Sequence, residues 1–176
     1  ALVAEAVAAL PADGSGPTVQ GFGHRLSNWP RVPTVVELDA VTGAVPTVLI
    51  SGDVHSGWLN SAALAALGLP AASADDPGAP MREDPWFAVL DRLDEIPGTR
   101  EMREAGYCEV LADMLARGVT GVVDMAWSDD PEDWPRRLAA MGTRGALPEV
   151  LPRIRAAVYR DKLERWIAAG LRTGEA

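Results

Sequence analysis

Cysteine and histidine are scarce in this sequence, which contains one cysteine, Cys108, and two histidines, His24 and His55. A single cysteine excludes an internal disulfide and fits a reducing compartment, so we expect a cytoplasmic protein. No run approaches the roughly 20 apolar residues of a membrane-spanning helix. The apolar first ten residues lack the positively charged segment of a signal peptide.

Positive charge is also in short supply, because 16 Lys and Arg residues face 25 Asp and Glu residues, for a formal net charge of -9. Nucleic-acid binders usually present a basic face, and anionic membranes attract basic clusters. We therefore expect neither a nucleic acid nor a membrane as a partner. A length of 176 residues, 48% of them hydrophobic, is ordinary for one globular domain with its own core.

Several catalytic motifs are missing. There is no H-x-H, H-E-x-x-H or C-x-x-C, so a metal site would need His24, His55, Cys108 and Asp124 to gather through folding. There is no G-x-S-x-G, and three sequence neighbours such as Asp53, His55 and Ser56 cannot form a triad, whose members converge from separated segments. No phosphate-binding glycine motif opens a helix.

The hydrophobic pattern predicts alternating strands and helices. We expect strands at residues 18–26, 47–51, 119–127 and 153–159, and helices at residues 2–10, 35–41, 61–67, 84–96, 101–117 and 161–169. The helix after the third strand should begin with Asp130 as its cap and Pro131 in its first position. Short connections between these elements indicate an α/β fold with parallel β/α units.

His55 is the first candidate site residue, because the pattern places it in a strand-to-helix turn after residues 47–51. The carboxyl ends of strands are where α/β proteins place ligand contacts, although a histidine here can also simply bond a loop. Trp58 either walls a pocket or packs the loop onto the core. Asn60 is well placed to cap the following helix.

Asp124 is the second candidate, because it interrupts an apolar strand that we expect to be buried. An ionised carboxylate is expensive there unless it is paired or lies at the strand's end. Asp124 is near the carboxyl end, where a barrel's site opens. A structural ion pair with Arg153 or Arg155 on the next strand is the competing explanation.

Four segments together resemble a known family: "GFGHRLSNWP", "ELDAVTGAVPTVLISGDVHSGWLNSAALAALGL", "MREDPWFAVLDRLD" and "RGVTGVVDMAW". They occur in the order seen in amidohydrolase family 3, the branch of metal-dependent hydrolases that includes N-substituted formamide deformylases. The D-x-H-S-x-W-x-N-S-x-A-L stretch is the most specific part. The sequence departs from the family at "GFGHRL", where G-W-D is common, so His24 and Arg25 inherit no role.

The resemblance implies that residues 1–176 are a single internal segment of a (β/α)₈ barrel hydrolase. Residues 1–100 would be an insertion after the first barrel strand, and residues 101–176 about two β/α units. In the complete enzyme a divalent metal, expected to be zinc, would activate water to attack an amide-like C–N bond of a small molecule.

The family's metal ligands have no counterparts in this sequence. The resemblance implies that they lie before Ala1 and after Ala176, and Lys162, the only lysine, does not match the bridging position. We therefore assign no catalytic or metal-binding residue and expect His55, Trp58 and Asp124 to be substrate-binding. The alternative is a non-catalytic α/β binding or interaction module.

Two or three strands taken from a barrel leave unpaired edges and an apolar face. We predict that this face is covered, either by a second copy or by the rest of the enzyme. Light scattering checks this prediction, and a monodisperse, cooperatively folding monomer would contradict it.

Because the ligand set is missing, we also predict that the 176-residue chain alone binds no stoichiometric zinc and hydrolyses no formamide or amide. Elemental analysis of the purified chain should find no tightly held ion. One bound ion per chain would overturn this prediction.

Overall fold

The computed structural model describes residues 2–10, 18–73, 75–125, 130–143 and 151–172. The chain divides into two compact units, Ala1–Glu101 and Met102–Ala176. The predicted assignment of the two parts to an insertion and to barrel units stays a prediction. Among the described residues, no helix combines the length and the apolar character needed to cross a membrane.

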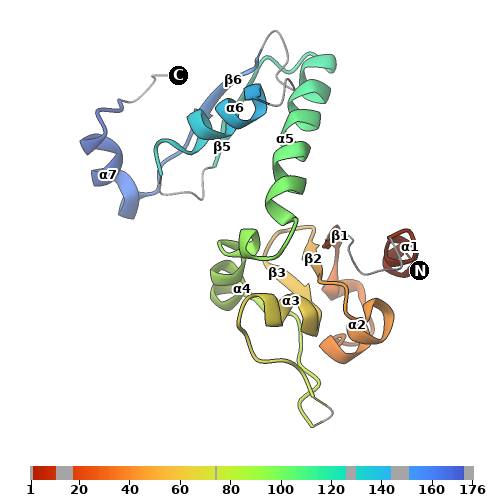
Figure 1. Cartoon of the computed structure of the whole chain (residues 1–176). Helices are drawn as coiled ribbons and strands as arrows, with labels where there is room; N and C mark the ends of the chain where they lie inside the picture. The colour runs from red at the N-terminus through yellow and green to blue at the C-terminus, as the bar shows by residue number, and fades with distance from the viewer. Residues whose placement is uncertain (1, 11–17, 74, 126–129, 144–150, 173–176) are drawn as a thin grey trace. The chain divides into compact units, whose positions relative to one another are not determined.

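The first unit is built on a four-stranded sheet in the order β1-β2-β3-β4 (Figure 1). The strands are β1 (Val19–His24), β2 (Thr47–Ser51), β3 (Ser56–Leu59) and β4 (Met81–Arg82). β1 and β2 are parallel, whereas β3 runs antiparallel to both β2 and β4. The helices of this unit are α1 (Leu2–Ala8), α2 (Val35–Thr42), α3 (Ser61–Ala66), α4 (Glu83–Leu90) and the start of α5 (Thr99–Ala116), with 3₁₀ turns at η1 (Leu26–Asn28) and η2 (Leu93–Glu95).

The prediction of a strand-to-helix turn at His55 is wrong, because β3 lies between β2 and α3. Residues 52–55 instead form the turn of a hairpin in which Val48 pairs with Leu59 and Ile50 with Gly57. β3 has only four residues, and Ser and Gly have low strand propensity. Tertiary packing, rather than local preference, makes this segment a strand.

That packing centres on Trp86 of α4, whose side chain is fully buried. A Cβ atom added to Gly57 would lie 2.0 Å from the indole ring, so only glycine lets the ring lie against β3. The indole Nε1 donates a hydrogen bond of 2.7 Å to the carbonyl of Val54. The surrounding core contains apolar residues from the sheet, α2, α3, α4 and η2: Val35, Val48, Leu59, Ala63, Leu64, Leu67, Val89, Leu93 and Ile96.

Asn60 is the buried polar centre of the unit and caps α3, as predicted. Its Oδ1 accepts hydrogen bonds of 2.9 Å from the backbone N–H groups of Thr47 and Ala63. Its Nδ2 donates bonds of 2.8 Å to the Thr42 hydroxyl and the Val45 carbonyl. One amide therefore joins the end of α2, the start of β2 and the start of α3.

The second unit contains most of α5, followed by β5 (Gly121–Asp124), α6 (Asp133–Thr143), β6 (Arg153–Ala156) and α7 (Leu163–Ala168). β5 and β6 pair in parallel, which confirms the predicted β/α arrangement. The mixed α/β class predicted from the hydrophobic pattern is confirmed in both units.

Two predictions for this unit need correction. β5 is not a buried strand, because its residues alternate between exposed and half-buried and Val123 is 64% exposed. Pairing with β6 covers an edge of β5 and not its faces, and among the described residues nothing buries the side chains of the face that carries Val123. The last two residues of the predicted strand, 126 and 127, lie outside the described residues. α6 begins at Asp133 rather than Pro131, because Asp130 forms a turn by accepting the Glu132 N–H.

Gly57→Ala should lower the free energy of unfolding by about 1–3 kcal/mol, because the new methyl group overlaps the buried Trp86 ring. Denaturant titration measures the change. Gly106→Ala in α5 is the matched control: its Cβ meets no neighbour, and alanine favours a helix by roughly 0.5–1 kcal/mol. Equal stability of Gly57→Ala and the parent chain would contradict the packing described here.

Candidate functional site

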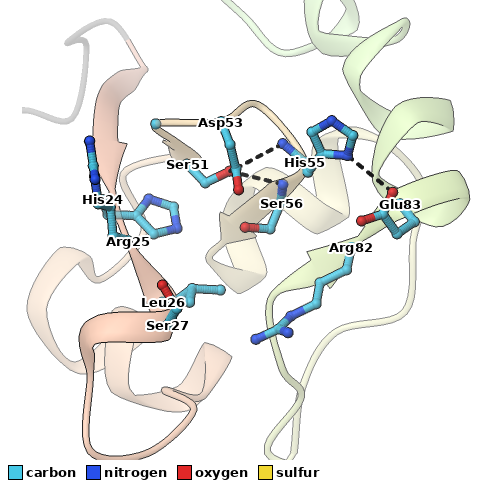
Figure 2. Close-up of a pocket in the computed structure, with 11 residues that line it drawn as sticks. His24, Arg25, Leu26, Ser27, Ser51, Asp53, His55, Ser56, Arg82 and Glu83 are labelled. Atoms are coloured by element: carbon cyan, nitrogen blue, oxygen red, sulfur yellow. Dashed lines mark hydrogen bonds and ion pairs between the residues drawn. The ribbon is translucent and has the colours of Figure 1, made fainter.

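A cavity of about 410 Å³ lies beside the β2–β3 turn in the first unit (Figure 2). Its lining comes from four segments: the end of β1, the η1 turn, residues 51–56 and the β4–α4 junction. Pockets for small molecules commonly enclose 300–1,000 Å³. The cavity is therefore large enough for a small ligand.

Side-chain hydrogen bonds fix the turn that forms one wall. Ser51 donates its hydroxyl to Asp53 Oδ1 at 2.5 Å and accepts the N–H of Ser56 at 2.9 Å. Asp53 also accepts the backbone N–H of His55 at 3.1 Å. Figure 2 shows these oxygens meeting inside the turn. The Ser51 hydroxyl, followed by the His55 N–H, holds the pKa of the Asp53 carboxyl below its usual range, so the carboxylate stays ionised near neutral pH.

His55 lies at the mouth of the cavity with its side chain 57% exposed. Its Nδ1 is 3.1 Å from Glu83 Oε2, and its ring packs edge-on against Phe87. A carboxylate only accepts hydrogen bonds, so Nδ1 carries the proton in this contact. In the part of the chain that the structure describes, Nε2 has no hydrogen-bond partner, and it remains free to accept or, when the ring is protonated, to donate.

The backbone on either side of this contact is strained. Val54 has φ +66° and Glu83 has φ +52°, in the left-handed region that β-branched and long side chains rarely adopt. Such positions cost about 1–3 kcal/mol each and persist where the surroundings enforce them. Two hydrogen bonds hold the backbone in this conformation. Trp86 Nε1 donates to the Val54 carbonyl, and the Glu83 N–H donates to the His55 carbonyl at 3.1 Å.

His24 forms part of the pocket wall and pairs in register with Ser51. Both ring nitrogens are buried without a well-formed hydrogen bond, and the ring packs at 5.8 Å from that of Trp29. Burial lowers the pKa of His24, whereas the Ile50 carbonyl and Asp53 oppose the shift. Since the Ser51 hydroxyl bonds to Asp53 instead, the described residues contain no serine–histidine pair at this pocket.

Trp58 does not line this cavity. Its Nε1 donates to the Thr34 carbonyl at 3.0 Å, and its ring packs edge-on against Trp29. Together with Trp29 and neighbouring residues it lines a separate depression of about 220 Å³. Trp58 thus joins β3 to the start of α2, and its predicted contact with substrate stays a prediction.

Asp124 belongs to the second unit, at the carboxyl end of β5 as predicted. Its Oδ2 accepts a 2.7 Å hydrogen bond from the indole Nε1 of Trp134 on α6. Among the described residues it forms no ion pair with Arg153 or Arg155, the partners that the sequence suggested. Its role toward substrate stays a prediction.

Arg82 and Glu83 are pocket residues that the sequence did not single out. They reach the site because β4 pairs with β3, where Arg82 is opposite Ser56. A two-residue strand leaves no periodic pattern, so hydrophobicity gives no signal for it. Only their place in the family-like segment "MREDPWFAVLDRLD" marks them.

A metal centre does not fit the described residues. Within ranges 2–10, 18–73, 75–125, 130–143 and 151–172, no three His, Cys, Asp or Glu side chains are grouped to hold an ion. At the pocket itself, the nitrogens of His24 are sealed and the Asp53 carboxylate is already held by the turn.

Solved structures with a similar fold include an uncharacterized metal-dependent hydrolase from Pyrococcus horikoshii OT3, with a TM-score of 0.60 and 23% identity over 96% of this chain and 33% of that chain. Another, from Pyrococcus furiosus, has a TM-score of 0.59 and 21% identity over 99% of this chain and 36% of that chain. At these identities the likeness concerns the fold, and the chain spans about a third of each structure's length.

A comparison with curated proteins found no match. A family model described as the amidohydrolase family matches residues 1–172. Together with the similar solved structures, this match confirms the predicted fold class, an α/β segment that fits part of a (β/α)₈ hydrolase barrel. The chain belongs to the amidohydrolase family.

Proposed function

We propose that this chain is a segment of a metal-dependent amidohydrolase that hydrolyses the amide- or formamide-like C–N bond of a small molecule. The family match over residues 1–172 is the observation that carries the proposal. Similar solved structures described as metal-dependent hydrolases support it. The D-x-H-S-x-W-x-N-S stretch resembles amidohydrolase family 3, which includes the N-substituted formamide deformylases, and we take a formamide-like bond as the first candidate.

The metal of such an enzyme, which we take to be zinc, would be held by residues outside these 176. This chain spans 33% and 36% of the length of the similar structures, so most of each of those proteins has no counterpart here. When bound, the metal would supply an activated water for attack on the C–N bond. The part of this chain is then to bind and orient the substrate.

His55 is the residue we assign to substrate. Glu83 contacts the ring through Nδ1, and the Asp53 network holds the backbone, so Nε2 is the ring nitrogen left for a ligand beside the cavity. Nε2 can accept an amide N–H or, when the ring is protonated, donate to a carbonyl. Holding a substrate in one orientation lowers the entropic part of the barrier.

The second unit supports association with further polypeptide. Val123 on β5, Met125 directly after it and Ile167 on α7 are 64%, 63% and 61% exposed, so large apolar side chains of this unit face solvent. We assign these side chains to contact with the remaining β/α units of the same enzyme. Asp124 would then lie at the carboxyl end of a barrel strand, where barrel enzymes place their sites.

In the full-length enzyme, His55→Ala should lower kcat/KM by about 10- to 100-fold, the loss expected for one hydrogen bond to the transition state. The metal content should not change. Steady-state kinetics on a panel of N-formyl and N-acyl amines, with elemental analysis, measure both.

Asp91→Ala, an exposed change at the end of α4 outside the pocket, is the control and should retain the parent kcat/KM. Loss of metal from His55→Ala would place His55 among the ligands or their supporting residues. Unchanged kinetics would remove His55 from the site. A panel with no metal-dependent turnover at all would overturn the proposed function.

A further inference from the structure

We propose that the cavity contains an anion subsite in which Arg82 binds a carboxylate group of the substrate. The inference deepens the proposed function and rests on it. It assigns the substrate to N-acyl or N-formyl compounds that carry a carboxylate.

The pairing of charges in the first unit is the first argument. This unit has five arginines and no lysine. Arg31, Arg92 and Arg100 form ion pairs with Glu37, Glu95 and Asp94. The two arginines that have no hydrogen bond or ion pair among the described residues are Arg25 and Arg82, and both line the cavity.

The acidic residues of the cavity show the opposite arrangement. Asp53 is held by the Ser51 hydroxyl and the His55 N–H, and Glu83 by the His55 ring. The chain has 25 acidic and 16 basic residues, so there are more than enough carboxylates to pair with every arginine. An arginine without a carboxylate partner is therefore not explained by a shortage of acidic residues. The cationic side chains of this cavity are therefore the ones without a carboxylate partner, and a guanidinium group, which donates hydrogen bonds and accepts none, is suited to an anion.

The position of Arg82 suits such a role. Its backbone is fixed twice, by pairing with Ser56 in the sheet and by its place before the first residue of α4. Figure 2 shows its side chain extending from β4 toward the segment that carries Leu26 and Ser27. A guanidinium held in this way can bind both oxygens of one carboxylate through parallel N–H donors.

The local charge favours a carboxylate over a phosphate. Asp53 stays ionised, since its turn hydrogen bonds keep its pKa low, and Glu83 faces the same cavity. A phosphate would add nearly two negative charges beside them, whereas a carboxylate adds one. His24 adds no positive charge to balance a dianion, because burial disfavours its protonated form.

The subsite can be tested without turnover by isothermal titration of the full-length enzyme with 3-phenylpropionate and 3-phenylpropanol, which have no C–N bond. We expect the carboxylate to bind at least about tenfold more tightly than the alcohol, as expected for a charge-assisted hydrogen-bond pair. Arg82→Gln should remove this preference, and Arg82→Lys should retain part of it, because lysine keeps the charge but not the fork.

Arg100→Gln is the matched control, an exposed arginine of the same unit outside the cavity, and should leave the affinity within about twofold. Inorganic phosphate should not displace the carboxylate, and displacement at equal concentration would overturn the choice of carboxylate. Carboxylate binding that persists in Arg82→Gln would place the anion elsewhere, for example on the metal, and would overturn the subsite.

A kinetic measurement connects the subsite to catalysis. The ratio of kcat/KM for N-formylglycine to that for N-formylglycinamide should fall by at least about tenfold in Arg82→Gln, through KM. An unchanged ratio contradicts the subsite. If neither compound nor any other amide is hydrolysed, the proposed function fails, while the titration still decides whether Arg82 binds a carboxylate.

Discussion

The contact between Trp86 and β3 is the constraint on which the rest of the first unit depends. The indole occupies the space that a side chain at position 57 would fill, and its N–H holds the Val54 carbonyl at 2.7 Å. The Trp86 side chain therefore packs in the core and also bonds to the turn that carries His55. Because protein cores have few packing alternatives, the orientation of the turn follows from the packing of the core.

Asn60 applies a second constraint at the opposite end of the hairpin. A fully buried amide is costly unless its donors and acceptors are satisfied, and here Oδ1 and Nδ2 bond to three separate segments. The loss of any one segment would leave buried polar atoms without partners. β2 and β3 are thus held at one end by a hydrogen-bond network and at the other by the Trp86 contact, and the pocket is built on a rigid frame.

Local chemistry made part of this structure predictable. The β-branched run "TVLIS" predicts β2 at the residues where it occurs, and an asparagine before an apolar helix predicts the cap at Asn60. β3 was not predictable, because Ser56 and Gly57 become strand residues only through Trp86, 29 positions or more along the chain. Arg82 and the Trp134 partner of Asp124 were missed for the same reason, since tertiary packing alone brings them to their positions.

The pocket also departs from what stability alone would select. The cavity lining includes Glu83, which has left-handed backbone, two arginines without carboxylate partners, and His24, whose ring nitrogens are buried without a well-formed hydrogen bond. Val54, the other residue with left-handed backbone, lies in the turn beside the cavity. The left-handed backbone and the buried, unbonded histidine nitrogens each destabilise the fold, and sequences commonly accept such departures where a ligand has to be bound. These unfavourable features occur together beside His55 and not across the rest of the described first unit. They therefore indicate a ligand site at the place where the family-like motif lies, and they do so without reference to the family.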